Sequence, residues 1–255
     1  MLRTLLERFS RNRILKRRLP SRAGGQVLYV SPDSALAYWK HNLEEKHKDL
    51  IDWAQEFVKP GMTVWDVGAN VGIFTFASAF FAGPAGKVLG MEPDTFMSSL
   101  LQRSAMVPCK SRAEIRILPV AMSNKIGIAE FAIAARGRSS NHLADVNGNE
   151  MSGGDRYHMT VLTVTMDWLI QNTPPPDVIK IDVEGAEHMV LEGGYGLISK
   201  AHPLLLCEVN SSNSDTVSEL LTTLGYEMFD LNDRSKGPIA KAVFNTLAVY
   251  KKDRM

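Results

Sequence analysis

The sequence predicts an α/β protein with a doubly wound, mostly parallel β-sheet that carries helices on both faces. Short apolar runs alternate with segments of helical periodicity along most of the chain. One run, residues 63–67, passes through a glycine turn into an apolar helix, as the first strand of such a sheet does. With 255 residues, the chain is long enough to bury a large core without disulfides or metals.

The expected elements follow from apolar runs that are bounded by turn residues. Five strands of the main sheet are expected near residues 63–67, 87–91, 115–120, 178–182 and 204–209. Extra strands are expected near 128–133 and 159–165, where β-forming residues are frequent. Helices are expected at 73–80, directly after the first strand, and at 212–224.

The turn after the first strand is suited to hold a ligand against the backbone. Gly68 and Gly72 lack Cβ atoms where the chain must bend and approach another group closely. The next helix offers free N–H groups at its N-terminus. Glu92 ends the second strand, where a carboxylate accepts hydrogen bonds from both hydroxyls of a ribose. The pattern therefore predicts a nucleoside-cofactor site.

The same turn favours S-adenosylmethionine over a nicotinamide dinucleotide. A dinucleotide turn follows Gly-x-Gly-x-x-Gly, but Asn70 and Ile73 occupy its last two glycine positions here. Asp66, an anion at the end of the first strand, repels a diphosphate but suits ammonium and sulfonium groups. The two acids, Asp66 and Glu92, argue against a plain strand-to-helix turn without a ligand.

The chain resembles the FkbM-type methyltransferases, a family with the class I S-adenosylmethionine-dependent fold. The matching stretches are residues 59–72, 91–94, 119–127, 164–169, 177–187, 190–194 and 203–208. The most specific of them is Lys180-Ile181-Asp182-Val183-Glu184-Gly185-Ala186-Glu187. The chain departs from the family at Met166, which replaces a usual Leu, and at Ser104, which replaces a frequent Asn. Neither departure touches the cofactor residues.

The resemblance implies a Rossmann-like sheet of seven strands, with residues 226–230 and 246–250 as the sixth and seventh. It also implies an O-methyltransferase that acts on a hydroxyl of a sugar, a polyketide or another small natural product. The residues expected to contact S-adenosylmethionine are Asp66, Val67, Gly68, Ala69, Asn70, Gly72, Glu92, Pro93, Ala121 and Asp182. Two other functions stay open, namely a binding or scaffold module without turnover and a nicotinamide-dependent oxidoreductase.

Acidic residues at the strand ends are the candidates for catalysis. Asp182 ends the fourth strand, at the sheet edge where ligands bind, and is the first candidate to position the acceptor or take its proton. Glu184 is the next candidate, and Glu208 ends the fifth strand beside them. As an alternative, Glu184 and Glu187 cap the helix that begins at Gly185.

These acids also suit Mg²⁺, a hard cation that prefers oxygen ligands. Their spacing matches no defined metal motif, so we assign no metal ligand and keep Mg²⁺ only as an alternative. The basic Lys180 is expected to pair with an acid such as Asp167.

The chain divides by its motifs into residues 1–58, a basic arm with a helical lid or packing segment, and residues 59–255, the methyltransferase domain. Residues 1–22 hold eight basic residues and one acid. Their apolar residues share one helical face, which suits contact with an acidic membrane surface or partner as well as simple packing. A core-facing helix is expected at 34–58, and its start, Tyr38–His41, is an alternative lining for a substrate pocket.

Residues 135–158 form a long polar excursion rich in Gly, Ser and Asn. Segments of this kind are usually functional or disordered, and we expect a mobile substrate loop. If it covers the cofactor, Arg136, Arg138 and His142 meet the acceptor, which makes His142 a further candidate for the base.

Composition adds little about partners. The formal net charge is +1, which gives no reason to expect nucleic acid. Cys109 and Cys207 form no metal motif and no disulfide framework, and the N-terminus lacks the apolar centre of a secretion signal. A cytoplasmic location is therefore expected. Neither the identity of the acceptor nor the oligomeric state follows from the sequence.

Overall fold

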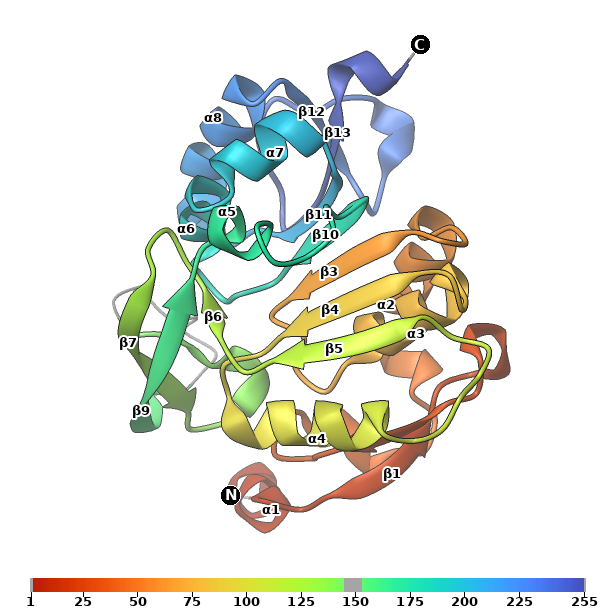
Figure 1. The fold of residues 1–255 in the computed structure, drawn as a ribbon. Coiled ribbons are helices and arrows are strands. Elements are labelled where there is room, and N and C mark those ends of the chain that lie inside the picture. Colours follow the sequence, from red (N-terminus) through yellow and green to blue (C-terminus); the bar gives the residue numbers. More distant parts are fainter. Residues whose placement is uncertain (1, 145–152, 255) are drawn as a thin grey trace.

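A seven-stranded sheet forms the centre of the molecule (Figure 1), in a computed structural model that describes residues 2–144 and 153–254. Its strands are β3 (Thr63–Val67), β4 (Lys87–Met91), β5 (Glu114–Leu118), β10 (Val178–Ile181), β11 (Leu204–Glu208), β12 (Tyr226–Asp230) and β13 (Asn245–Tyr250). Their order is β12-β13-β11-β10-β3-β4-β5. Only β13 runs antiparallel to its neighbours in this sheet. The predicted doubly wound, mostly parallel sheet of the class I fold is confirmed.

Helices cover both faces of this sheet (Figure 1). One face carries α2 (Glu44–Phe57), α3 (Ile73–Ala82) and α4 (Thr95–Ala105), and the other carries α5 (Met166–Leu169), α6 (Glu187–Glu192), α7 (Tyr195–Ala201) and α8 (Ser214–Thr223). Successive strand residues alternate between the two cores, so Val64 packs in the first and Trp65 in the second. Burial on both faces explains why the strands are continuously apolar.

A second sheet is inserted between β5 and β10. It contains β6 (Ala121–Met122), β7 (Gly127–Ala134), β8 (His142–Leu143) and β9 (Asp155–Val164), in the order β6-β9-β7-β8. The strands expected near 128–133 and 159–165 are β7 and β9, which pair antiparallel with each other and not with the main sheet. This insertion sheet lies beside the carboxyl ends of β4 and β5 (Figure 1).

The N-terminal segment packs against the first helical face. Helix α1 (Leu2–Ser10) precedes a hairpin of β1 (Leu15–Arg18) and β2 (Val27–Val30), which the sequence did not predict. The hairpin is joined to α4 by the N–H of Tyr29, which donates to Ser104 Oγ at 2.8 Å. Short 3₁₀ turns are η1 (Ser21–Ala23), η2 (Leu36–Trp39), η3 (Arg138–Ser140), η5 (Ser211–Asn213), η6 (Arg234–Lys236) and η7 (Lys251–Arg254).

The helix expected at residues 34–58 is wrong in its first ten residues. Only α2 and the short η2 form there, and α2 is kinked at His47. The buried guanidinium of Arg17 donates to the carbonyls of Tyr38, Trp39 and Lys40, at 3.0, 2.9 and 2.7 Å. Those carbonyls are therefore engaged by a side chain from β1 instead of by helical N–H groups.

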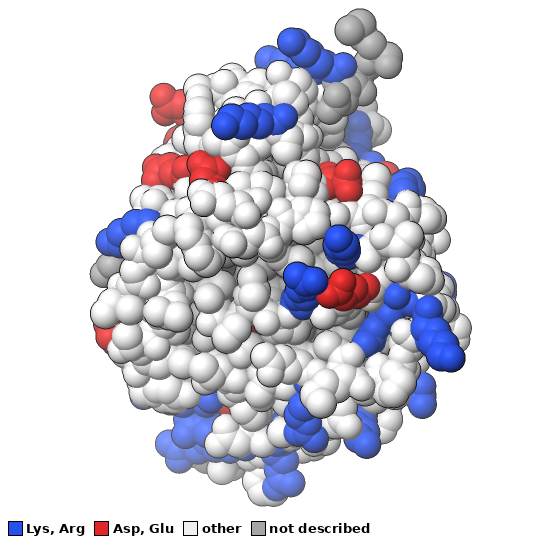
Figure 2. All heavy atoms as spheres, in the orientation of Figure 1, with Lys and Arg blue, Asp and Glu red and all other residues white. Residues whose placement is uncertain are grey.

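Helix α1 leaves Leu5, Leu6 and Phe9 exposed. Figure 2 shows Lys and Arg side chains gathered at the end of the molecule where α1 and β1 lie. The contact of residues 1–22 with an acidic membrane surface or partner stays a prediction. Within the described part of the chain, every helix is too short or too polar to cross a bilayer.

A buried cluster of charges, which we call the Arg138 clasp, joins three parts of the chain. Arg138 Nε lies 2.9 Å from Asp33 in the N-terminal segment, and Nη1 lies 2.7 Å from Asp94, the N-cap of α4. Its Nη2 donates to Tyr157 Oη in β9 at 3.0 Å. Arg156 adds a second ion pair to Asp33 at 2.9 Å. The clasp fixes η3 of the insertion against α4.

Removing the cation from the clasp is expected to destabilise the fold. Arg138→Met removes the cation paired with the buried carboxylate of Asp94 and leaves it only neutral donors such as Asn141, so the free energy of unfolding should fall by about 3–5 kcal/mol. Urea denaturation measures this change. The control is Arg116→Met, which breaks an exposed pair with Glu114 and should cost less than about 1 kcal/mol. Equal losses in the two variants would contradict the role of the clasp.

Candidate active site

The glycine turn after β3 brings its backbone into contact with the end of β10. Gly68 has a φ of +80°, and a Cβ at this position would lie 1.8 Å from the carbonyl oxygen of Asp182. Asn70 also has a positive φ, +51°, which Asn tolerates better than most residues. Gly72, with φ +92°, starts α3. Only glycine fits position 68, because any side chain would separate the two strand ends.

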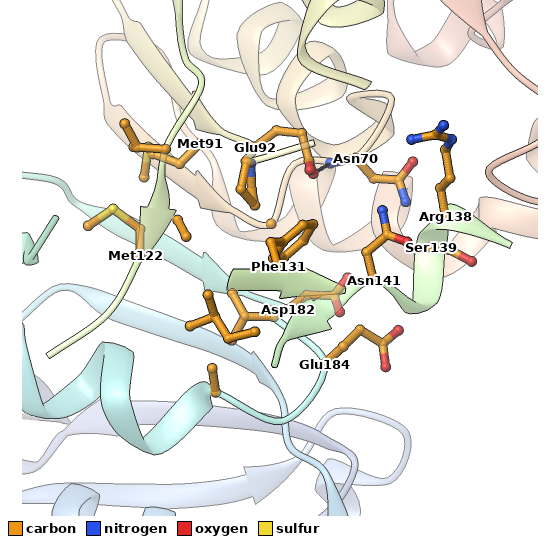
Figure 3. Close-up of a pocket in the computed structure, with 17 residues that line it drawn as sticks. Asn70, Met91, Glu92, Met122, Phe131, Arg138, Ser139, Asn141, Asp182 and Glu184 are labelled. Carbon is orange, nitrogen blue, oxygen red and sulfur yellow. Dashed lines mark hydrogen bonds between the residues drawn. The ribbon is translucent and has the colours of Figure 1, made fainter. Parts of the chain in front are cut away.

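Glu92 lies between β4 and α4, with both carboxylate oxygens held by backbone N–H groups. The N–H of Asn70 donates to Oε2 and the N–H of Asp94 to Oε1, each at 2.8 Å. The side chain is buried, and Figure 3 shows it beside Asn70 on the cavity wall. Burial, helped by the carboxylate of Asp94, raises the pKa of Glu92 to about 8. Below about pH 8 the acid is therefore protonated, so one oxygen can accept a further hydrogen bond and the O–H can donate one.

A second charged group lies at the ends of β3 and β10. Asp66 and Lys180 stand directly opposite each other in the register of these strands, with Nζ 3.6 Å from Asp66 Oδ1. Lys180 also donates to Asp182 at 3.0 Å, and Thr75 Oγ1 donates to Asp66 Oδ2 at 2.5 Å. Asp66 Oδ1 is buried without a hydrogen-bond partner among the described residues. The expected pairing of Lys180 with Asp167 is wrong, because the strand register places Lys180 beside Asp66.

These contacts set the charges of the group. Burial raises the pKa of Asp66, although the Lys180 ammonium opposes the shift. Burial alone would lower the pKa of Lys180, but the carboxylates of Asp182 and Asp66 outweigh it and raise the pKa. Lys180 therefore stays an ammonium at neutral pH. Glu208 lies nearby, and burial followed by repulsion from Asp182 raises its pKa to about 8.

Three cavities meet at the end of β10. The first, which we call the apolar cavity after one of its walls, is lined there by Met91, Pro93, Val120, Ala121, Met122, Phe131 and Leu143, and elsewhere by polar residues that include Asn70, Glu92, Arg138, Ser139 and Asn141. The second, the turn cavity, follows the glycine turn and reaches Asp66, Lys180, Tyr38 and His47. The third, the acidic cavity, is lined by Glu187, Glu208, Asn210, Ser211, Lys241 and Phe244, among others. Asp182 and Glu184 line all three.

Most of the residues expected to contact the cofactor lie around the first two cavities. Pro93 and Ala121 line the apolar cavity, and Ala69 and Gly72 line the turn cavity. Val67 instead packs fully buried in the second core. Figure 3 shows Glu92 and Asn70 across the apolar cavity from Asp182 and Glu184.

The candidates from the polar excursion do not come together at one cavity. His142 is buried in β8, where Nδ1 lies 3.2 Å from the carbonyl of Ser140, and it lines none of the three cavities. The guanidinium of Arg138 borders the apolar cavity but is engaged in the clasp. Residues 145–152 of the expected loop lie outside the described residues. The catalytic role of His142 therefore stays a prediction that the geometry does not favour.

Glu187 is the first residue of α6, and its side chain holds the loop that precedes this helix. It accepts the N–H of Gly185 at 2.7 Å and the Nδ2 of Asn213 at 2.8 Å, and it is almost fully buried. Glu187 therefore stands in the first turn of α6, as expected for an acid, but its hydrogen bonds hold the preceding loop and do not cap the helix. Among the described residues, no group of three His, Cys, Asp or Glu side chains is placed to hold one metal ion. The structure therefore gives no support to the Mg²⁺ alternative.

Several side chains of the apolar cavity were missed from the sequence, among them two from the insertion sheet. Phe131 and Leu143 come from the insertion sheet and complete the apolar wall. The β-rich composition around Phe131 predicted the strand but not that the Phe131 side chain lines the cavity. Tyr38, named only as an alternative, is buried and lines the turn cavity.

The chain is similar in sequence to known methyltransferases. The family model described as the methyltransferase FkbM domain matches residues 66–233. The hexuronic acid methyltransferase AglP of Haloferax volcanii is 27% identical over 175 residues, which cover 66% of this chain and 65% of that protein. The chain thus spans slightly less than two thirds of the length of this relative.

Solved structures are more distant. A methyltransferase FkbM from Methylobacillus flagellatus has a TM-score of 0.49 at 15% identity, over 78% of this chain and 50% of that chain. A SAM-dependent O-methyltransferase from Thermotoga maritima has a TM-score of 0.43 at 13% identity, over 80% of this chain and 64% of that chain.

The raised pKa of Glu92 predicts a pH dependence of stability. Between its ordinary pKa of 4.5 and about 8, folded Glu92 holds a proton that the unfolded chain has released. Its stabilising contribution is complete below about pH 4.5 and is lost as the pH rises to about 8. Urea denaturation near pH 5 and pH 8 should show a larger loss of stability in the wild type than in Glu92→Gln.

Glu92→Gln turns an amide –NH₂ toward one of the two backbone donors, so it should be less stable than the wild type at every pH. Glu208 titrates in both proteins, so only the difference between their pH slopes reports on Glu92. Equal slopes would contradict the raised pKa.

Proposed function

The chain belongs to the FkbM methyltransferase domain family, and from this premise we propose that it transfers a methyl group from S-adenosylmethionine to an oxygen of a sugar-like acceptor. The observation that carries the proposal is the meeting of three cavities at Asp182 and Glu184. Two of these cavities suit the two halves of the donor, and the third is left for the acceptor.

The fit of the donor is supported by two carboxylates with unused hydrogen-bonding capacity. Glu92, at the wall of the apolar cavity, offers lone pairs to ribose hydroxyls, while the apolar side chains suit a purine. Asp66 Oδ1 is buried and lacks a hydrogen-bond partner among the described residues, so it suits the ammonium of an amino acid. When bound, S-adenosylmethionine supplies a methyl group made electrophilic by its sulfonium.

An oxygen acceptor is supported by the chemistry of the Haloferax relative's substrate. A hexuronic acid offers hydroxyl and carboxyl oxygens and no nitrogen, so a methyl group that it receives from a sulfonium goes to oxygen. Four carboxyl groups line the acidic cavity; the raised pKa of Glu208 keeps this one neutral below about pH 8, and the field of the other three disfavours a carboxylate acceptor. We therefore propose a hydroxyl as the nucleophile.

The chain's own residues can position this hydroxyl and receive its proton. Asp182 is ion-paired with Lys180 and lies where the cavities meet, so we assign it to orient the hydroxyl by accepting its hydrogen bond. Glu208, with a pKa of about 8, suits the receipt of the proton at mildly alkaline pH. Glu184 borders all three cavities and is the next candidate to contact the acceptor.

Calorimetric titration with S-adenosylmethionine, S-adenosylhomocysteine and NAD tests the donor. Binding of the two sulfur nucleosides without NAD supports the proposal, and binding of NAD alone would replace it with an oxidoreductase. Binding of the sulfur nucleosides without methyl transfer to any hydroxylated sugar would favour a scaffold module. Mild alkali then distinguishes the products, because a methyl ether survives it and a methyl ester does not.

Replacing Asp182 should separate turnover from donor binding. Asp182→Asn keeps the size of the side chain but weakens its hold on the hydroxyl, so kcat should fall by about 100-fold or more. The Kd for S-adenosylmethionine should change by only a few-fold. Asp49→Asn, at an exposed position on α2, is the control and should match the wild type. Equal losses of kcat and affinity would make Asp182 a binding residue only.

A further inference from the structure

We infer that the acidic cavity holds a pyranose ring of the acceptor, stacked on the side chain of Phe244. This inference rests on the proposed function and names the part of the molecule that recognises the sugar. The cavity has a volume of ≈ 520 Å³, within the usual range for small-molecule sites. It shares Asp182 and Glu184 with both donor-side cavities and Glu208 with the turn cavity, but contains neither the glycine turn nor Glu92.

Phe244 is a large apolar side chain of this cavity that stays in contact with water. Its exposed fraction is 62%, although it borders a cavity lined by Glu208, Asn210 and Lys241. An aromatic face carries negative charge density, and it attracts the positively polarised C–H groups on the face of a pyranose ring. The ring hydroxyls project sideways, where carboxylate and amide groups accept or donate hydrogen bonds.

The backbone of Phe244 is fixed, so the exposed ring has a defined place. Its carbonyl accepts the N–H of Val209 at 2.7 Å, directly after β11. On the preceding residue, the Val243 N–H donates to Thr246 Oγ1 at 2.9 Å and the Val243 carbonyl accepts from the same hydroxyl at 2.6 Å. Thr246 itself is fully buried in β13. A rigid backbone under an exposed aromatic ring reduces the entropy that binding must overcome.

The arrangement places the sugar beside the proposed chemistry. Glu208 ends β11, and its register partner Asn245 follows Phe244 in the chain. A pyranose ring that rests on Phe244 therefore lies beside Glu208 at the end of β11. Asp182 directly follows the neighbouring strand, β10. The structure thus assigns recognition of the sugar face to Phe244 and handling of the hydroxyl to the acids.

The test compares Phe244→Ala and Phe244→Trp with Phe9→Ala. Phe9 is a matched control, because it is 66% exposed but lies on α1, outside the cavity. Methyl β-glucuronide and methyl β-glucoside are titrated into protein saturated with S-adenosylhomocysteine, and steady-state methyl transfer to the same probes is measured.

Phe244→Ala should weaken binding of the probe and raise its KM about tenfold, since aromatic stacking contributes on that scale. The Kd for S-adenosylmethionine and the urea midpoint should stay at wild-type values, because the ring is exposed and lies away from the donor residues. Phe244→Trp, which keeps an aromatic face, should retain binding, and Phe9→Ala should behave as the wild type.

Three results would overturn the inference. The first is methyl transfer to a pyranose with a wild-type KM in Phe244→Ala. The second is a wild-type protein that binds the donor and methylates a furanose or an open-chain polyol, but neither binds nor methylates a pyranose. The third is a change in oligomeric state in Phe244→Ala, which would make the ring an interface between copies. Failure of the wild type to bind S-adenosylmethionine would instead defeat the proposed function, so the two failures are distinguishable.

Discussion

The close contact between the glycine turn and the end of β10 is the constraint on which the site depends. Gly68 lies so near the carbonyl of Asp182 that no side chain fits between them. The N–H of Asp182 continues the pairing by donating to Val67 at 3.0 Å. Because the two strand ends stay together, Asp66, Lys180 and Asp182 form one charged group at the carboxyl edge of the sheet.

That charged group shows why the site suits a cationic ligand. The ammonium of Lys180 is shared between two carboxylates, and Glu208 adds a third acid whose ionisation burial opposes. Buried carboxylates of this kind are costly to ionise unless positive charge approaches them. A ligand with ammonium and sulfonium groups would supply that charge. The same buried carboxyl groups therefore explain both the raised pKa values and the suitability of the site for the proposed cationic donor.

The cavities are completed by segments that do not belong to the central sheet. The insertion sheet contributes Phe131 and Leu143, and the N-terminal segment contributes Tyr38 and His47. The Arg138 clasp ties both segments to Asp94, two residues after Glu92. Its energetic role is to hold the cavity walls beside Glu92, and this explains why an arginine in a polar excursion is almost fully buried.

The sequence by itself determined where the main strands lie along the chain, the glycine turn and the acids at the strand ends. These features depend on local periodicity and on backbone conformations that few residues adopt. It also placed Asp66, Glu92 and Asp182 at one edge, since the carboxyl ends of parallel strands meet there. The tertiary structure alone decided that Lys180 faces Asp66, which follows from strand register. It likewise decided that Arg17 interrupts the expected helix, that β7 and β9 form a separate sheet, and that Phe244 stays exposed beside Glu208. Each of these outcomes depends on contacts between residues far apart in the chain, which local patterns do not encode.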